Sequence, residues 1–146
     1  MKAERKHISA DRVRNAVRFR AEMFVLVSAT VAALAGDYWA LDYIEIPAQS
    51  RCGLESIAWI FILIASGISL ALKLLLARFF KYAKLYPALG ILLTSAVCTA
   101  ALASAENGET IRQAAECAVY ICFAAEIVAA VFFAIKTETA RETAKD

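Results

Sequence analysis

Four long apolar stretches constrain the fold of this chain more than any other feature. They cover approximately residues 22–41, 57–76, 87–105 and 117–135. Each has about 20 residues, the length that a helix needs to cross a hydrocarbon core about 30 Å thick. Of all residues, 61% are hydrophobic and 21% are charged, which is too apolar a balance for a small water-soluble domain. The sequence therefore predicts an all-α integral membrane protein, a four-helix bundle made of two transmembrane hairpins.

The first stretch gives the weakest of the four signals. Its uncharged run from Met23 to Gly36 ends at Asp37, although Tyr38 and Trp39 suit a membrane interface. A second interpretation stays open, because the basic leader, the apolar run and the small residues before Gly36 resemble a secretory signal with its cleavage site. The basic region is long for such a signal, so we expect an uncut first helix.

The distribution of Lys and Arg predicts the orientation. Of the 16 Lys and Arg residues, all but Arg51 and Arg112 lie in residues 1–21, around the link between the second and third stretches, or in residues 136–146. Positive residues collect on the cytoplasmic side of a membrane. We therefore expect a multi-pass protein of the bacterial inner (plasma) membrane with both termini in the cytoplasm. Residues 1–21 form a basic amphipathic segment, residues 22–135 the transmembrane domain, and residues 136–146 a short tail.

The basic segment and the inner link are predicted to contact the membrane surface. Residues 9–22 are expected to form a helix that lies on the inner surface before turning into the first span. The second helix is expected to continue to Tyr86, where Pro87 ends it and opens the third helix. A nucleic-acid-binding arm is the alternative for the basic segment, but no stacking aromatic platform accompanies it, so no nucleic-acid partner is expected. The residues expected to bind anionic lipid headgroups are Arg12, Arg14, Arg18, Lys81 and Lys84.

Small residues recur at four-residue spacing in the apolar stretches. Such pairs let transmembrane helices approach closely. Packing inside one bundle explains many of them, and contacts in a homo-oligomer or with partner membrane subunits explain the rest. The pairs are Ala29 and Ala33, Ala32 and Gly36, Gly67 and Ala71, Ala96 and Ala100, and Ala125 and Ala129.

Glu126 is the most informative single residue, because it lies near the middle of the fourth stretch. A carboxyl group there costs roughly 2.5 to 3.5 kcal/mol to insert, so it should face protein or water. Counting depth along each helix predicts a polar layer at the same level. Two interpretations remain open: a proton or cation site, or a structural carboxyl that joins helices. The predicted ion or proton pathway contains Glu126, Thr30, Ser66, Thr94 and Ser95.

Lys73 and the cysteines suggest further contacts. The same depth count puts Lys73 about 10 Å from the midplane, so we expect it to extend toward the headgroups rather than pair with Glu126. Cys52 and Cys117 both fall at outer helix ends and are candidates for a disulfide. Cys98 and Cys122 could approach Glu126 as a soft-metal site, but buried free cysteines are the simpler interpretation. We therefore expect no metal.

Signs of enzymatic chemistry are weak. The single histidine, His7, lies in the basic segment, which leaves no histidine for haem ligation or catalysis within the membrane. No phosphate-binding or zinc-binding motif occurs, so we expect no enzyme and no cofactor. The favoured hypothesis is a small oligomeric channel or transporter for ions or protons. The alternative is a non-catalytic membrane component, namely a subunit of a larger complex, an immunity protein or a defence effector that acts through partners.

Overall fold

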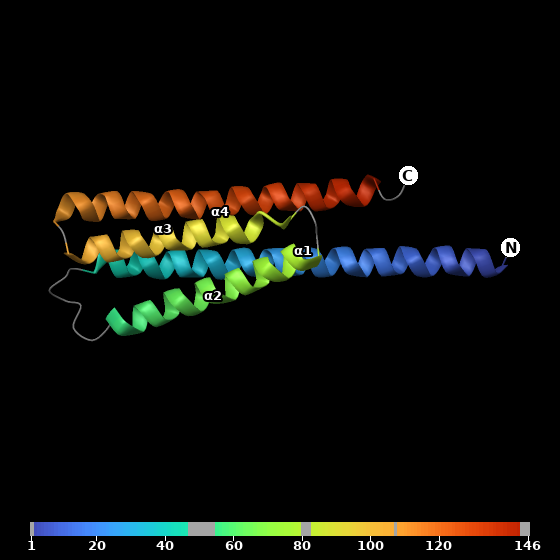
Figure 1. Cartoon of the computed structure of the whole chain (residues 1–146), viewed down its shortest axis with the longest axis horizontal. Coiled ribbons are helices and arrows are strands. Elements are labelled where there is room, and N and C mark those ends of the chain that lie inside the picture. Colours follow the sequence, from blue (N-terminus) through green and yellow to red (C-terminus); the bar gives the residue numbers. More distant parts are fainter. Residues whose placement is uncertain (1, 47–54, 80–82, 107, 144–146) are drawn as a thin grey trace.

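The chain folds into an all-α four-helix bundle (Figure 1). The computed structural model describes residues 2–46, 55–79, 83–106 and 108–143; for residues 2–12, 55, 56 and 106 it describes the backbone alone. The helices are α1 (Lys2–Glu45), α2 (Glu55–Phe79), α3 (Tyr86–Glu106) and α4 (Glu109–Thr143).

The four helices run side by side, with both termini at one end of the bundle (Figure 1). Helices α1 and α3 each pack against all three other helices. Helices α2 and α4 lie across the bundle from each other, with α1 and α3 between them. A direct contact between α2 and α4 therefore has to be made by long side chains through the bundle interior.

Each helix turns one narrow stripe of residues toward the interior. On α4 the stripe advances in steps of three and four residues, as in helices that pack with a slight left-handed twist. Most buried hydrophobic residues of the bundle are small or aliphatic, and they form three clusters. The α4 stripe consists of Ala115, Val119, Cys122, Glu126, Ala129, Phe133 and Thr137.

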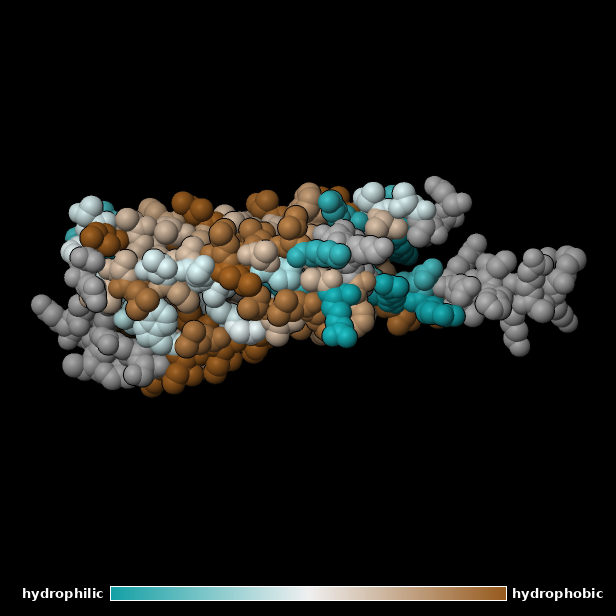
Figure 2. Space-filling view, in the orientation of Figure 1, coloured by the Kyte–Doolittle hydropathy of each residue, from teal (hydrophilic) through white to brown (hydrophobic). Residues whose placement is uncertain are grey.

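The outer surface of the bundle carries many large hydrophobic side chains. Large hydrophobic side chains such as Phe24, Leu63, Leu92 and Ile121 are exposed on the four helices. Figure 2 shows hydrophobic side chains along the length of the bundle and hydrophilic ones concentrated toward the end that holds the termini. Monomeric soluble proteins rarely expose apolar surface of this extent. All four helices contain a stretch long and apolar enough to cross a membrane. These features indicate a multi-pass membrane protein whose outer face contacts lipid.

Two sequence predictions about the helix ends are wrong. Helix α1 is continuous, so the basic segment extends along the axis of the first span instead of turning onto a surface. No Gly or Pro occurs between Lys2 and Ala35 to interrupt it, and adding a residue to an existing helix is favourable. Helix α2 ends at Phe79 rather than reaching Tyr86. The cause is packing between helices. Ala83 and Tyr86 are buried against residues of α2 and α4, in positions that a straight continuation of α2 would not reach.

The extension of α1 also touches the end of α4. The guanidinium of Arg141 lies 4.6 Å from the centre of the Phe19 ring, a cation–π contact. The contact ties the basic end of α1 to the bundle beyond the apolar region.

Candidate functional site

The candidate site is a cluster of charged side chains in the interior of the apolar bundle. Lys73 Nζ on α2 donates a hydrogen bond to Glu126 Oε1 on α4 at 2.6 Å. The two side chains are only 2% and 3% exposed. Charge-assisted hydrogen bonds of this length are among the strong ones in proteins. Removing two charges from water is costly, however, so the pair must be held in good geometry to be tolerated.

Gly90 on α3 makes the space that the Lys73 side chain occupies. A Cβ atom added at Gly90 would lie 2.8 Å from Lys73 Cδ and 3.2 Å from Lys73 Nζ. A side chain at this position would therefore require the lysine chain to shift. The glycine allows Lys73 to pass close to the α3 backbone on its way to Glu126.

The expectation that Lys73 extends toward the headgroups, away from Glu126, is wrong. Side chains on a helix lean toward its N-terminus, which directs Lys73 toward the middle of α2 instead of its nearer C-terminal end. Counting rise from an assumed midpoint ignored this lean, the length of the lysine chain and the inclination of α2 (Figure 1).

Tyr86, at the start of α3, covers one side of the pair. Lys73 Nζ lies 5.0 Å from the centre of the Tyr86 ring, within cation–π range. The ring also packs against Phe133 of α4, with the ring centres 4.5 Å apart. The Tyr86 hydroxyl lies 3.4 Å from Thr30 Oγ1, and Thr30 donates to the carbonyl oxygen of Leu26. Tyr86 thus connects the ion pair to α1.

Asp37 on α1 adds a second buried carboxyl group to the cluster. Its side chain faces the bundle interior and interacts electrostatically with both Glu126 and Lys73. Within the described part of the chain, Asp37 Oδ2 and Glu126 Oε2 are buried oxygens that have no hydrogen-bond partner. The cluster therefore contains two acidic groups and one basic group, and it has acceptor atoms to spare.

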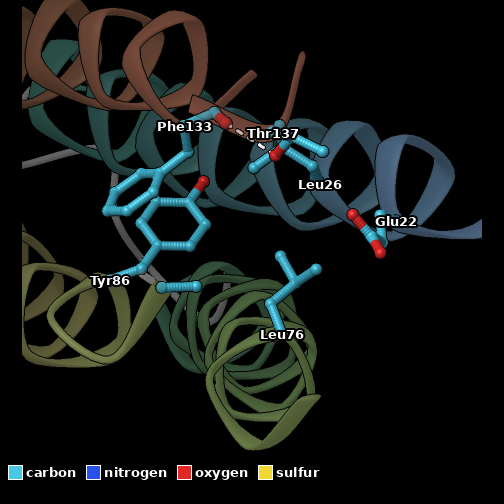
Figure 3. Close-up of a pocket in the computed structure, with 7 residues that line it drawn as sticks. Glu22, Leu26, Leu76, Tyr86, Phe133 and Thr137 are labelled. Atoms are coloured by element: carbon cyan, nitrogen blue, oxygen red, sulfur yellow. Dashed lines mark hydrogen bonds between the residues drawn. The ribbon is translucent and has the colours of Figure 1, made fainter. Parts of the chain in front are cut away.

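A small cavity lies beside Tyr86, toward the end of the bundle that holds the termini (Figure 1). Figure 3 shows the side chains that line it. Its volume is about 10 Å³, which is close to the minimum for one water molecule. Its polar lining comes from Glu22, Tyr86 and Thr137 and its apolar lining includes Leu26 and Leu76.

The predicted hydroxyl layer is only partly assembled around Glu126. Thr30 lies next to Tyr86, as described. Ser66 is half-buried, and its hydroxyl lies close to Gly36, where α1 and α2 meet. Thr94 is half-buried, whereas Ser95 is exposed and donates to the carbonyl oxygens of Ile91 and Leu92 on its own helix.

The other candidate residues lie outside the cluster. Arg14, Arg18 and Lys84 are exposed, while Lys81 and the side chain of Arg12 fall outside the described residues, so headgroup binding stays a prediction. Cys52 also falls outside them, and Cys117 is exposed, so their disulfide stays a prediction as well. Among the described residues, no three His, Cys, Asp or Glu side chains are grouped to hold a metal ion.

The burial of Asp37 and the pairing of Lys73 were not predicted, although the sequence carries a signal for both. Asp37 follows Ala29 and Ala33 at four-residue steps, which places it on the same buried stripe of α1. Lys73 follows Ser69 in the same way on α2. Extending each interior stripe through its charged residues would have placed both inside the bundle.

The chain was compared with known proteins. No family model, curated protein or solved structure matches it. Any inference about function therefore rests on the buried cluster itself.

Proposed function

We propose that this chain is a small membrane protein that moves protons or cations across the bilayer as a homo-oligomer. Its ionic site consists of Asp37, Lys73 and Glu126. The observation that carries the proposal is the imbalance of the cluster: two buried carboxyl groups face one buried ammonium group. The unpartnered oxygens of Asp37 and Glu126 are the atoms to which a proton or a cation would bind.

The charge imbalance gives the site a reason to exchange ions. An uncompensated charge inside an apolar bundle is far more costly than one in water. One additional positive charge, either a proton or a metal cation, balances the cluster. Ionisable groups inside a membrane commonly mark ion pathways or proton relays for this reason. Binding and release of that charge at Asp37 or Glu126 is the elementary step that the proposal requires.

The enclosure of the ion pair favours a transporter over a permanently open pore. Lys73 and Glu126 are almost completely buried, and side chains of all four helices surround them. An ion reaches such a site by proton transfer or after a rearrangement of the helices. The membrane orientation belongs to the same proposal: both termini lie in the cytoplasm, as the distribution of Lys and Arg predicts.

Proteoliposomes provide the test. Purified protein is reconstituted in vesicles that contain a pH-sensitive dye, and a potassium gradient with valinomycin sets the driving force. Proton flux or cation-dependent flux is expected for the wild type and is expected to be lost in Glu126→Gln. Glu138→Gln is the matched control, because Glu138 is exposed near the end of α4. The proposal is contradicted if the protein adds no proton flux to these vesicles and no Na⁺ or K⁺ flux to vesicles without valinomycin.

A non-catalytic membrane component is the second candidate. The observation that favours it is the same enclosure of Lys73 and Glu126, because a buried pair across the bundle also serves to fix the packing of its helices. This candidate predicts that liposomes containing the protein show no ion flux. It also predicts that a partner subunit co-purifies in fixed stoichiometry from native membranes. Native mass measurement in detergent separates the two, since the first predicts a homo-oligomer and the second a mixed complex.

A further inference from the structure

We propose that protons reach the ionic cluster from the end of the bundle that holds both termini, through a water molecule in the cavity beside Tyr86. This inference rests on the proposed function and deepens it, because it identifies the proton as the ion and one end of the bundle as its entrance. The cavity is just large enough for one water, and three of its lining residues carry polar groups. A water needs two to four such partners to be held.

Glu22 forms the outer end of the route. Its side chain is 12% exposed and pairs with Arg18 at 3.4 Å, so it lies where the bundle meets the surface. The same carboxyl group lines the cavity, on the side opposite Tyr86 (Figure 3). Glu22 can therefore take a proton from outside the bundle and present it to a water inside.

Tyr86 connects the cavity to the cluster. Its side chain lines the cavity, and Lys73 Nζ lies over the face of its ring, 5.0 Å from the ring centre. A phenolic hydroxyl can donate and accept a hydrogen bond at the same time, which a proton relay requires. Thr30, at 3.4 Å from the Tyr86 hydroxyl, provides a second hydroxyl at this point. The apolar lining from Leu26, Leu76 and Phe133 limits the route to this narrow passage.

The proposed route delivers one proton to Glu126 and returns Lys73 to its charged form. Lys73 passes a proton along its 2.6 Å hydrogen bond to Glu126 Oε1, so the carboxylate becomes a neutral carboxylic acid. The Tyr86 hydroxyl, which lies beside Thr30 Oγ1 in the structure, turns toward Lys73 and passes it a proton taken up from the water. The water regains its proton from Glu22, and Glu22 regains one from outside the bundle. The cluster has gained one proton and its charge rises by one unit. The charged or titratable groups that face Glu126 are Lys73 from α2, Asp37 from α1, Tyr86 from α3 and, on α4 itself, Cys122.

The opposite end of the bundle is closed by apolar packing. There the core consists of aliphatic side chains from all four helices, among them Ile44, Ile62, Val97 and Val119. A groove between α3 and α4 on that side is lined mainly by alanine and aliphatic side chains, with Ser95 and Thr99 as its polar members. The cavity beside Tyr86 has a carboxyl group in its lining, whereas the groove between α3 and α4 has none, and this is the reason for placing the entrance at the Glu22 end.

The test measures proton flux into dye-loaded liposomes for Tyr86→Phe and Glu22→Gln. Tyr86→Phe removes the hydroxyl but keeps the ring that packs on Phe133 and Lys73. Tyr120→Phe, at an exposed position of α4, and Glu138→Gln are the matched controls. Both test variants are expected to lower the initial flux by about tenfold or more, and both controls to retain it. Glu22 is partly exposed, so Glu22→Gln keeps the test valid should Tyr86→Phe fold poorly.

Three outcomes separate the two proposals. Slow flux in both test variants, together with loss of flux in Glu126→Gln, supports the route. Wild-type flux in Tyr86→Phe and Glu22→Gln, with flux still lost in Glu126→Gln, overturns the route and leaves the proposed function standing. A wild-type protein that passes no protons overturns the proton route; if it also passes no cations, the proposed function fails with it.

Discussion

Lys73 Nζ lies 2.6 Å from Glu126 Oε1, and this pair joins α2 to α4 across the diagonal of the bundle. The backbones of these two helices do not pack along each other, because α1 and α3 lie between them. The pair therefore links two helices that the rest of the packing connects only indirectly. A change in this pair is therefore expected to affect both the stability of the bundle and the binding of ions at the site.

The first prediction concerns the loss of one partner of the pair. Lys73→Met removes the ammonium group but keeps an unbranched side chain of similar length. Glu126 is then left buried beside Asp37 without a compensating charge, and the free energy of unfolding is expected to fall by about 3 kcal/mol. Thermal unfolding in detergent at neutral pH measures the change.

The double variant Lys73→Met, Glu126→Met is the control for this prediction. Replacing a whole buried ion pair with apolar residues is often neutral or stabilising, so most of the lost stability is expected to return. Equal stability of the wild type and the Lys73→Met protein would show that the pair does not hold the bundle together.

The second prediction uses two glycines in helices. Gly90→Ala places a Cβ atom 2.8 Å from Lys73 Cδ, so the lysine must move and its bond to Glu126 must lengthen. We expect a loss of about 1 to 3 kcal/mol. Gly67→Ala meets nothing within 4 Å and is expected to stabilise its helix by up to about 1 kcal/mol. Opposite shifts in the thermal midpoint of the two variants would confirm the role of Gly90, whereas a parallel rise in both would exclude it.

Much of the bundle could be predicted from sequence because lipid constrains a chain so strongly. A spanning segment needs about 20 apolar residues, and such segments are visible without any knowledge of packing. Glu126 also stands out, because a carboxyl group in the middle of an apolar run is costly to insert and therefore indicates a structural or functional role.

The partners of Glu126 could not be predicted in the same way. Pairing depends on the tilt of α2, on the direction in which the Lys73 side chain leans, and on the space that Gly90 leaves. None of these is a property of one helix. Asp37 was interpreted as a boundary residue for the same reason: its depth depends on how far α1 continues, and α1 runs through to Glu45.

A third prediction tests the contact between α1 and α2. The Ser69 hydroxyl donates to the carbonyl oxygen of Ala29 at 2.8 Å, between two helices. Ser69→Ala is expected to lower the free energy of unfolding by about 0.6 to 1.7 kcal/mol, the range of such bonds in membrane proteins. Ser95→Ala is the control, because the Ser95 hydroxyl bonds only within its own helix. If both substitutions had the same effect, the interhelical bond would contribute nothing of its own.

A fourth prediction tests the proposed orientation. Gly108 lies between α3 and α4, and Thr143 ends α4, so the two positions lie at opposite ends of the bundle. In a protein without native cysteines, an impermeant thiol reagent added to sealed cells is expected to label Gly108→Cys but not Thr143→Cys. Permeabilised cells should label both. Labelling of Thr143→Cys in sealed cells would place the C-terminus outside and contradict the orientation that Lys and Arg predict.

The last prediction concerns the excess acidic group. Asp37→Asn removes one negative charge from the cluster but keeps a side chain of almost the same shape. Because Lys73 then faces a single carboxyl group, the buried charges are balanced and the free energy of unfolding is expected to rise by about 1 to 3 kcal/mol. The same change removes the site's need for an added proton or cation, so flux in liposomes is expected to fall. Asp42→Asn, at an exposed position on the same helix, should alter neither quantity. Gain of stability with loss of flux is the combination that a purely structural carboxyl would not produce, since a structural Asp37 should destabilise the bundle when replaced.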